Sequence, residues 1–138
     1  MNRHIRILAI FLFMTPLSFL SAQSVLTVDI LNLESNKGAV IVDLMDKNEE
    51  SVRDTTCQIL DHRCTIIFND LKSGPYAIRY FHDENENDEL DTNILGIPKE
   101  GFGFSNDAMG RFGPKDFSEW LFEVSGDTHI TMTTKYMN

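Results

Sequence analysis

Hydrophobic and polar residues alternate with a period of two along most of the chain after residue 23. Leu26, Val28 and Ile30 begin this pattern, with the polar residues Thr27 and Asp29 between them. Because successive side chains of a strand point to opposite faces of a sheet, the alternation predicts strands with one buried face. Further segments with this pattern are 40–44, 57–69, 76–80, 120–124 and 130–134. Together they predict an all-β domain.

Turn residues separate the predicted strands. Asn36 to Gly38 lies between the first two strands, and Asn and Gly tolerate the positive φ of tight turns. A second turn is expected at Leu60 and Asp61, and a last one at 125–127. We expect each of these turns to close a hairpin, which would place two consecutive strands side by side in one sheet.

The segment from Leu71 to Tyr76 follows the pattern L-x-x-G-x-Y. It resembles the tyrosine corner of Greek-key sandwiches, in which the phenol bonds backwards to the backbone. With about seven strands, it predicts a seven-stranded antiparallel Greek-key sandwich over residues 24–138, immunoglobulin-like or prealbumin-like. A small closed barrel is the alternative, because the number of strands does not say whether the sheets join.

Residues 83–117 interrupt the strand pattern and form one long inserted loop in this prediction. Loops of this length are usually functional or disordered, and the many large apolar residues here argue against disorder. We therefore expect the loop to fold back on the sandwich. Three of its aromatic residues, Phe102, Phe104 and Phe112, are candidates either for packing or for a recognition surface.

The long loop begins with an acidic stretch that has six carboxylates between Asp83 and Asp91 and no basic residue. Its oxygen-bearing side chains follow a D-x-N-x-N-x-x-x-D spacing, by which a tightly turning loop directs oxygens at a hard cation such as Ca²⁺. The candidate ligands are Asp83, Asn85, Asn87 and Asp91, with a main-chain oxygen near Glu89. A cation would also offset the repulsion among the carboxylates. The alternative is a solvated acidic turn.

The spacing departs from a complete EF-hand loop at two positions. Asp88 stands at the sixth position, where EF-hand loops have glycine, although Asp adopts positive φ more readily than most residues. Ile94 stands at the twelfth position in place of the bidentate glutamate, which excludes a complete EF-hand. Glu100 is a candidate for a more distant carboxylate.

His82 directly precedes the acidic stretch and suggests a different function, a metal-dependent hydrolase that uses His82 and the acidic loop. One histidine makes a poor zinc site, and the alternative is a strand-end residue that hydrogen-bonds the loop. Ser105 has neither a nucleophile elbow nor a matched base, so the sequence gives no support for a serine hydrolase. We expect no enzymatic activity and no catalytic residues.

The first 23 residues have the pattern of a secretory signal peptide. Basic residues precede an apolar run at 7–20, and small or polar residues follow it. Export, followed by cleavage near residue 23, would place the mature chain in a periplasm or in the extracellular space. The apolar run is too short to span a bilayer comfortably, and we expect no integral membrane segment in the mature chain.

The chain is acidic, with a formal net charge of −9. Removal of residues 1–23 would make it more acidic still, because this segment holds two basic residues and no acidic one. Nucleic acid and anionic membrane surfaces attract basic proteins, so neither is expected as a partner.

Cys57 and Cys64 are the two cysteines of the chain. An exported chain meets oxidising conditions, in which a pair of cysteines tends to close. Their spacing fits neither the C-x-x-C of zinc sites nor that of thioredoxin-like redox sites. The sequence therefore predicts a structural disulfide between them.

Two longer motifs resemble a known family. They are G-x-Y-A-I-x-x-x-H-D-E-N-x-N-x-x-L-D from Gly74 to Asp91, and L-G-I-P-x-E-G-F-G-F-S-N from Leu95 to Asn106. In them the chain resembles the bacterial exported-protein family catalogued as domain of unknown function 2141, over nearly all of the mature chain. The sequence differs from the usual family pattern at Asp88, where glycine is common, and in having its two cysteines. The resemblance implies a fold and an exported location, but no biochemical activity.

The sequence as a whole predicts an exported, non-enzymatic β-sandwich module. Its acidic loop would bind Ca²⁺ and organise residues 83–117 as a recognition surface for a protein or glycan at the cell envelope. The alternatives are the metal-dependent hydrolase and a purely structural envelope protein whose long loop only packs.

Overall fold

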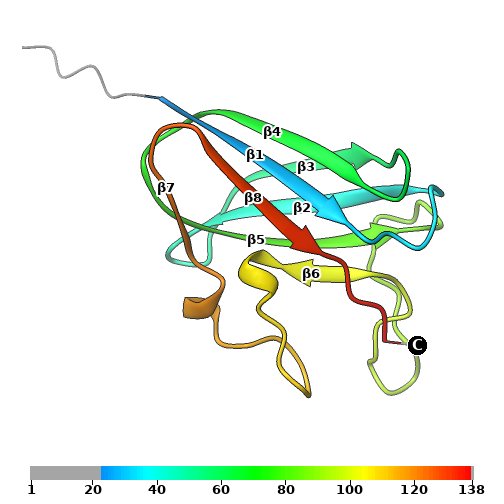
Figure 1. The fold of residues 1–138 in the computed structure, drawn as a ribbon. Coiled ribbons are helices and arrows are strands. Elements are labelled where there is room, and N and C mark those ends of the chain that lie inside the picture. The colour runs from blue at the N-terminus through cyan, green and yellow to red at the C-terminus, as the bar shows by residue number, and fades with distance from the viewer. Residues whose placement is uncertain (1–22, 138) are drawn as a thin grey trace, which may run out of the picture.

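The computed structural model describes residues 23–137, which form a sandwich of two β-sheets. Figure 1 shows β4, β1 and β8 in one layer and β3, β2 and β5 in the other. The signal peptide expected over residues 1–23 lies outside the described residues except for its last position. Within the described range, no helix has the length and apolar character needed to cross a membrane.

Residues 23–137 contain eight strands and two short 3₁₀ helices. The strands are β1 (Ser24–Leu31), β2 (Ala39–Asp46), β3 (Ser51–Gln58), β4 (Cys64–Leu71), β5 (Gly74–Asp83), β6 (Phe102–Phe104), β7 (Phe122–Val124) and β8 (Thr128–Thr133). The 3₁₀ helices are η1 (Ser105–Asp107) and η2 (Phe117–Glu119).

The strand order corrects the expected pairing of neighbours. One sheet has the order β4-β1-β8, and the other has the order β3-β2-β5-β6 with β7 also paired to β5. Strands β1 and β2 therefore belong to different sheets, as do β3 and β4, and β7 and β8. The three expected hairpins are wrong, because each of their turns carries the chain from one sheet to the other.

Two further details differ from the expected fold. Strand β8 runs parallel to β1, so the sandwich is not antiparallel throughout. The structure also has eight strands where about seven were expected, because the short β6 lies inside the long loop. The all-β, two-layer architecture is confirmed and the closed barrel is wrong, whereas the immunoglobulin-like or prealbumin-like topology stays a prediction.

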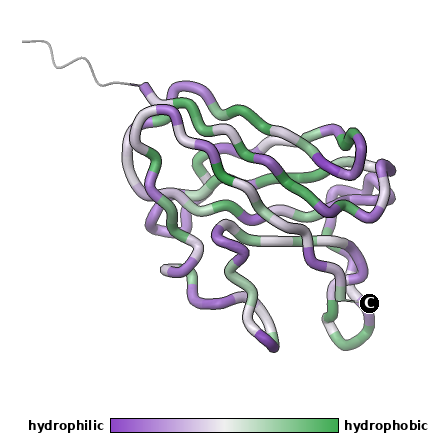
Figure 2. Tube along the Cα trace, in the orientation of Figure 1, coloured by the Kyte–Doolittle hydropathy of each residue, from purple (hydrophilic) through white to green (hydrophobic). Residues whose placement is uncertain are grey.

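The core lies between the two sheets and follows the alternation of the sequence. Leu26, Val28 and Ile30 of β1 are fully buried, while the residues between them are partly exposed. Figure 2 shows the corresponding alternation of hydrophobic and hydrophilic colour along the strands. Burial of these apolar side chains is the main favourable contribution to folding. The other sheet contributes Val40, Val42, Leu44, Ile78 and Tyr80 to the same cluster.

A smaller apolar cluster lies on the outer face of the five-stranded sheet, where the long loop packs back as expected. Ala108 of the loop and Trp120, three residues after the end of the loop, pack there on Met45 and Ala77 of the sheet. The buried Ser105 fixes this cluster, because its Oγ accepts the N–H of Ile78 at 2.9 Å and donates to the carbonyl of Trp120. Ser105 is thus a structural residue in this fold.

The tyrosine corner expected from the sequence is present. The hydroxyl of Tyr76, at the start of β5, donates to the carbonyl oxygen of Lys72 at 3.0 Å. We expect Tyr76→Phe to lower the free energy of unfolding by about 1 kcal/mol, because it removes this hydrogen bond and keeps the ring. Urea denaturation at constant m-value measures the loss, and an unchanged midpoint would show that the bond contributes nothing.

The two cysteines are free thiols in the structure, which corrects the predicted disulfide. Cys57 and Cys64 are buried on β3 and β4, and a turn at the Leu60–Arg63 bridge joins these strands across the two sheets. Their thiols interact without a covalent bond. A hydrogen bond from Cys64 lowers the pKa of the Cys57 thiol, and the same contact raises the pKa of Cys64.

Candidate functional site

The acidic stretch forms a compact turn at the end of β5. Asp83, the last residue of the strand, is only 2% exposed, and its carboxylate points back into the turn. Its Oδ1 accepts the N–H of Asn87 at 3.1 Å and its Oδ2 accepts the N–H of Asp88 at 2.9 Å. A buried carboxylate needs such donors, because removal from water is costly without them. Asp83 therefore sets the backbone of the whole turn.

The other predicted side-chain ligands gather around Asp91. The amide of Asn85 donates to Asp91 Oδ2 at 2.7 Å, and the amide of Asn87 donates to Asp91 Oδ1 at 3.3 Å. The side-chain oxygens of both asparagines also accept backbone N–H groups further along the turn, from Asn87 and Glu89 respectively. The structure thus brings together the four side chains that the spacing singled out.

The backbone of the turn has the left-handed conformation expected at its sixth position. Asp88 has φ of 62°, and Glu86 has φ of 59°. Position six of a calcium loop needs this conformation for its sharp turn, which explains why glycine is usual there. Aspartate supplies it here at a modest steric cost.

Glu100 anchors the turn from the middle of the long loop. It is 5% exposed, its Oε1 accepts the N–H of Glu84 at 3.0 Å, and its Oε2 accepts the N–H of Asp91 at 3.0 Å. One buried carboxylate therefore holds both ends of the acidic turn. Its position sixteen residues after Glu84 gave little sequence signal beyond its charge.

Gly38 supports the site from the opposite side. It lies in the connection between β1 and β2 with φ of +66°, and its Cα faces the backbone of Asp83. A Cβ at this position would overlap the carbonyl oxygen of Asp83 and lie 2.9 Å from its carbonyl carbon. Only glycine fits there, so Gly38 has a second role beyond the expected turn, which is to allow the close approach of its backbone to Asp83 at the start of the acidic turn.

His82 is a structural residue at the base of the site. It is fully buried, and its Nε2–H donates to the carbonyl of Lys37 at 2.7 Å. Because a carbonyl can only accept, Nε2 carries a proton, and in a neutral ring Nδ1 accepts from the hydroxyl of Tyr136 at 2.8 Å. Partial burial raises the pKa of that phenol, which keeps it protonated as a donor. Both ring nitrogens are occupied by residues outside the long loop, and His82 bonds the loop itself through its backbone N–H, which donates to the carbonyl of Gly101 at 2.7 Å.

The donor set of the turn suits a hard cation. Carboxylate and amide oxygens are the ligands that Ca²⁺ prefers, and Asp83 and Asp91 supply the negative charge. Within residues 23–137 no three His, Cys, Asp or Glu side chains converge on one point. A cation at this turn would thus depend on the amide oxygens of Asn85 and Asn87 and on a main-chain oxygen near Glu89.

The three aromatic residues proposed as a recognition surface have different environments. Phe102 is 7% exposed, Phe104 is half-buried with its ring 4.2 Å from that of Trp120, and Phe112 is 93% exposed. Phe102 therefore contributes mainly packing, one of the two uses that the sequence left open for it. Phe104 and Phe112 remain accessible to a partner.

Two clefts meet at Phe102 and Phe104. The first, which we call the sheet groove, has a volume of about 640 Å³ on the outer face of the five-stranded sheet. Its polar end holds Asp43, which accepts from Arg79 Nε at 3.0 Å and from Ser51 Oγ at 2.6 Å. The second, which we call the tip cleft because its lining includes the turns at residues 93–98 and 109–114, has a volume of about 450 Å³. Leu95 and Phe112 are among its lining residues.

Comparison with known proteins agrees with the motifs read from the sequence. Residues 28–132 match the model of a family described as an uncharacterized protein conserved in bacteria, DUF2141. The match runs from within β1 to within β8 and includes the acidic turn, Glu100 and the Phe-Ser-Asn segment. Neither the curated proteins nor the solved structures gave a match. The chain belongs to the family of uncharacterized bacterial proteins DUF2141.

Proposed function

We propose that the chain is an exported, non-enzymatic binding module whose acidic turn takes one Ca²⁺ and thereby organises the long loop for recognition. The observation that carries this proposal is the convergence of Asp83, Asn85, Asn87 and Asp91 on one turn. In addition, Glu100 holds the two ends of the turn together. Such a prearranged set of oxygens lowers the conformational cost of binding an ion.

A bound cation would stabilise the turn by reducing the repulsion among its carboxylates. The turn holds six carboxylates, and the hydrogen bonds of Asn85 and Asn87 to Asp91 offset only part of its charge. A bound Ca²⁺ supplies the missing positive charge. The turn would then fix the start of the segment that leads to β6 and to both clefts, which couples the ion to the recognition surface.

The sheet groove is the part of this surface that suits a protein or glycan of the cell envelope. Its apolar wall includes Phe81 and Phe104, and its polar end holds Asp43, Asp54 and Arg79. Binding sites commonly combine an apolar wall with a few polar groups that orient the ligand. The ion pair between Arg79 and Asp43 gives the groove both donors and acceptors.

The contacts of His82 favour a binding function over the metal-dependent hydrolase. A general base needs a free nitrogen, and a metal ligand needs a lone pair directed at the ion. Both nitrogens of His82 already have hydrogen-bond partners within the fold, Lys37 and Tyr136, and the nearest acidic oxygen, Oε1 of Glu84, lies 3.7 Å from Nδ1. A hydrolase would have to break these bonds before His82 could act.

The thermal midpoint tests the proposed function. We expect millimolar Ca²⁺ to raise the midpoint of residues 24–138 by about 5 °C over EDTA, since an ion at about ten times its Kd stabilises a domain of this size by about 1.4 kcal/mol. Mg²⁺ should raise it less, because Mg²⁺ demands a stricter octahedral geometry. Equal midpoints in Ca²⁺ and EDTA would contradict the proposal.

A matched pair of variants separates the ion from the rest of the turn. Asp91→Asn removes a charge at the centre of the candidate site, and Asp88→Asn removes one from an exposed residue that only provides the turn. Asp91→Asn should abolish most of the Ca²⁺-dependent rise, and Asp88→Asn should keep it. Asp83 is a poorer probe, because its loss also frees two backbone donors in the absence of any ion.

A further inference from the structure

Two turns of the long loop project from the same side of the molecule, below β6 in Figure 1. The first tip, residues 93–98, is closed by the hydrogen bonds of Gly96 N to Asn93 O at 2.9 Å and of Asn93 N to Ile97 O at 2.9 Å. The second tip, residues 109–114, is closed by Gly110 N to Gly113 O at 2.7 Å. Both tips are therefore turns whose backbone is closed by hydrogen bonds.

These tips carry unusually exposed apolar side chains. Ile94 is 102% exposed, Leu95 is 77% exposed and Phe112 is 93% exposed. Among residues 23–137, eight large apolar side chains are exposed, and five belong to the tips or border the tip cleft: Ile94, Leu95, Ile97, Phe112 and Met137. The remaining three are scattered over β3, β4 and the turn between them. A concentration of this kind marks an interaction site.

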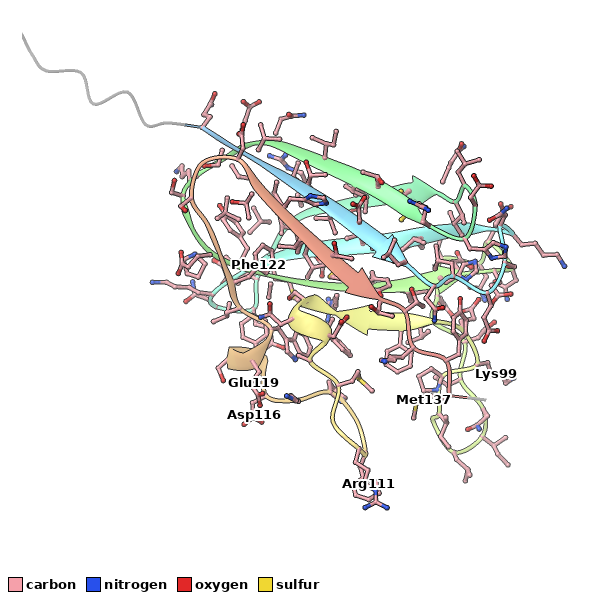
Figure 3. The ribbon with its side chains drawn as sticks, viewed as in Figure 1. Lys99, Arg111, Asp116, Glu119, Phe122 and Met137 are labelled. Atoms are coloured by element: carbon pink, nitrogen blue, oxygen red, sulfur yellow. The ribbon has the colours of Figure 1, made fainter. Side chains whose placement is uncertain are left out.

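The tips differ in charge from the rest of the chain, because the first, residues 93–98, is uncharged and the second, residues 109–114, carries Arg111. No acidic residue lies between Thr92 and Lys99 or between Ala108 and Lys115, although the chain has a net charge of −9. Figure 3 shows Arg111 at the far end of the second tip and Lys99 beside the first. The guanidinium of Arg111 lies 5.4 Å from the ring centroid of Phe112, which places a cation and an aromatic ring together. Lys115 is paired with Glu119 at 3.0 Å, so Arg111 and Lys99 provide the free positive charge.

We propose that the two tips dock the domain on an anionic phospholipid surface, with Ile94, Leu95 and Phe112 entering the apolar boundary of the bilayer. Apolar groups flanked by basic residues are the combination that binds such surfaces. The geometry favours lipid over a protein partner, because isolated side chains on projecting tips would each need a matching pocket on a protein. A second copy of the chain is disfavoured because the Arg111 side chains of two facing copies would repel each other.

This inference goes beyond the proposed function and does not require the cation. Each tip is closed by its own backbone hydrogen bonds, and none of these bonds involves the candidate cation ligands. The acidic net charge argued against anionic membranes as partners. The structure shows that the charge is unevenly distributed, and electrostatic attraction over a few ångströms depends on the nearby groups more than on the total.

Vesicle sedimentation tests the inference with residues 24–138, which contain the whole two-sheet domain. We expect the protein to sediment with vesicles of phosphatidylcholine and phosphatidylglycerol, in Ca²⁺ and in EDTA, and much less with phosphatidylcholine alone. The double variant Ile94→Ser/Phe112→Ser should reduce the partition coefficient by about tenfold or more, since each buried apolar side chain contributes strongly to partitioning. Arg111→Gln should weaken binding to the anionic vesicles alone.

Leu60→Ser is the matched control, because Leu60 is also a highly exposed apolar residue in a turn but lies away from the tips. It should bind vesicles as the wild type does. Equal sedimentation of the tip variant and the control would overturn the inference, as would a lack of wild-type binding to anionic vesicles. Dimerisation that the tip variant abolishes, without vesicle binding, would also overturn it in favour of a second copy. The Ca²⁺-dependent midpoint is measured on the same samples, so failure of the proposed function is seen separately.

Discussion

Replacing Gly38 by alanine is expected to lower the free energy of unfolding by about 3 to 5 kcal/mol, as the sum of backbone strain and overpacking. The residue has φ of +66°, which disfavours a Cβ, and the added methyl group would overlap the backbone carbonyl of Asp83. Backbone cannot rotate away as a flexible side chain can. The variant should also lose most of its response to Ca²⁺, because Asp83 is the first residue of the candidate site.

Gly126→Ala is the control for this variant. Gly126 has nearly the same φ, +67°, but nothing lies within 4 Å of the position of its Cβ. It should therefore lose about 1 kcal/mol from backbone strain alone, and its response to Ca²⁺ should be unchanged. Urea denaturation of both variants measures the difference. Equal losses would show that the contact between Gly38 and Asp83 has no energetic importance.

The second large effect is expected for Glu100→Gln, with a loss of about 2 to 3 kcal/mol. The Glu100 carboxylate accepts two backbone N–H groups, from Glu84 and Asp91, and it is nearly fully buried. Glutamine keeps the shape but replaces one acceptor by an NH₂ group, which would face a backbone donor. A buried donor left without a partner costs its full desolvation energy.

Glu86→Gln is the matched control for that substitution. Glu86 lies in the same acidic turn and loses the same charge, but its side chain is exposed. Its carboxylate is solvated, and its loss only slightly relieves the repulsion among the carboxylates of the turn. The free energy of unfolding should therefore change little. The comparison is made by urea denaturation in EDTA, where no ion contributes. Similar changes in the two variants would show that Glu100 acts only through its charge.

The sequence predicts the faces of the strands well but not their partners. Alternation identifies Leu26, Val28 and Ile30 as core residues, because it depends only on the local pleat of the strand. Whether the turn at Gly38 closes a hairpin or crosses between sheets depends on long-range packing that the local pattern does not contain. The parallel pairing of β1 with β8 joins the two ends of the domain, and no nearby turn residue signals it.

The candidate site shows the same division between local and distant signals. The spacing from Asp83 to Asp91 predicts the converging side chains, because they lie on one continuous turn. Glu100 and Gly38 reach that turn from distant segments, so their roles follow only from the three-dimensional structure.

Burial also decides between alternatives that the sequence left open. The pattern left open whether the loop aromatics pack or remain exposed, and the structure assigns Phe102 to packing and Phe112 to the surface. The cysteines likewise lie close together on β3 and β4, yet they are free thiols. The sequence identified the loop aromatics and the two cysteines as candidates, but only the three-dimensional structure shows which aromatics are buried and that the cysteines are not bonded to each other.

Calorimetric titration of Ca²⁺ into residues 24–138 tests the central claim most directly. If the acidic turn is the cation site, the titration will show one ion bound for each chain in the wild type and in Asp88→Asn. The same titration will show no saturable binding in Asp91→Asn. Absence of binding heat across accessible temperatures in the wild type, or one bound ion in all three proteins, would contradict the assignment of the turn as a Ca²⁺ site.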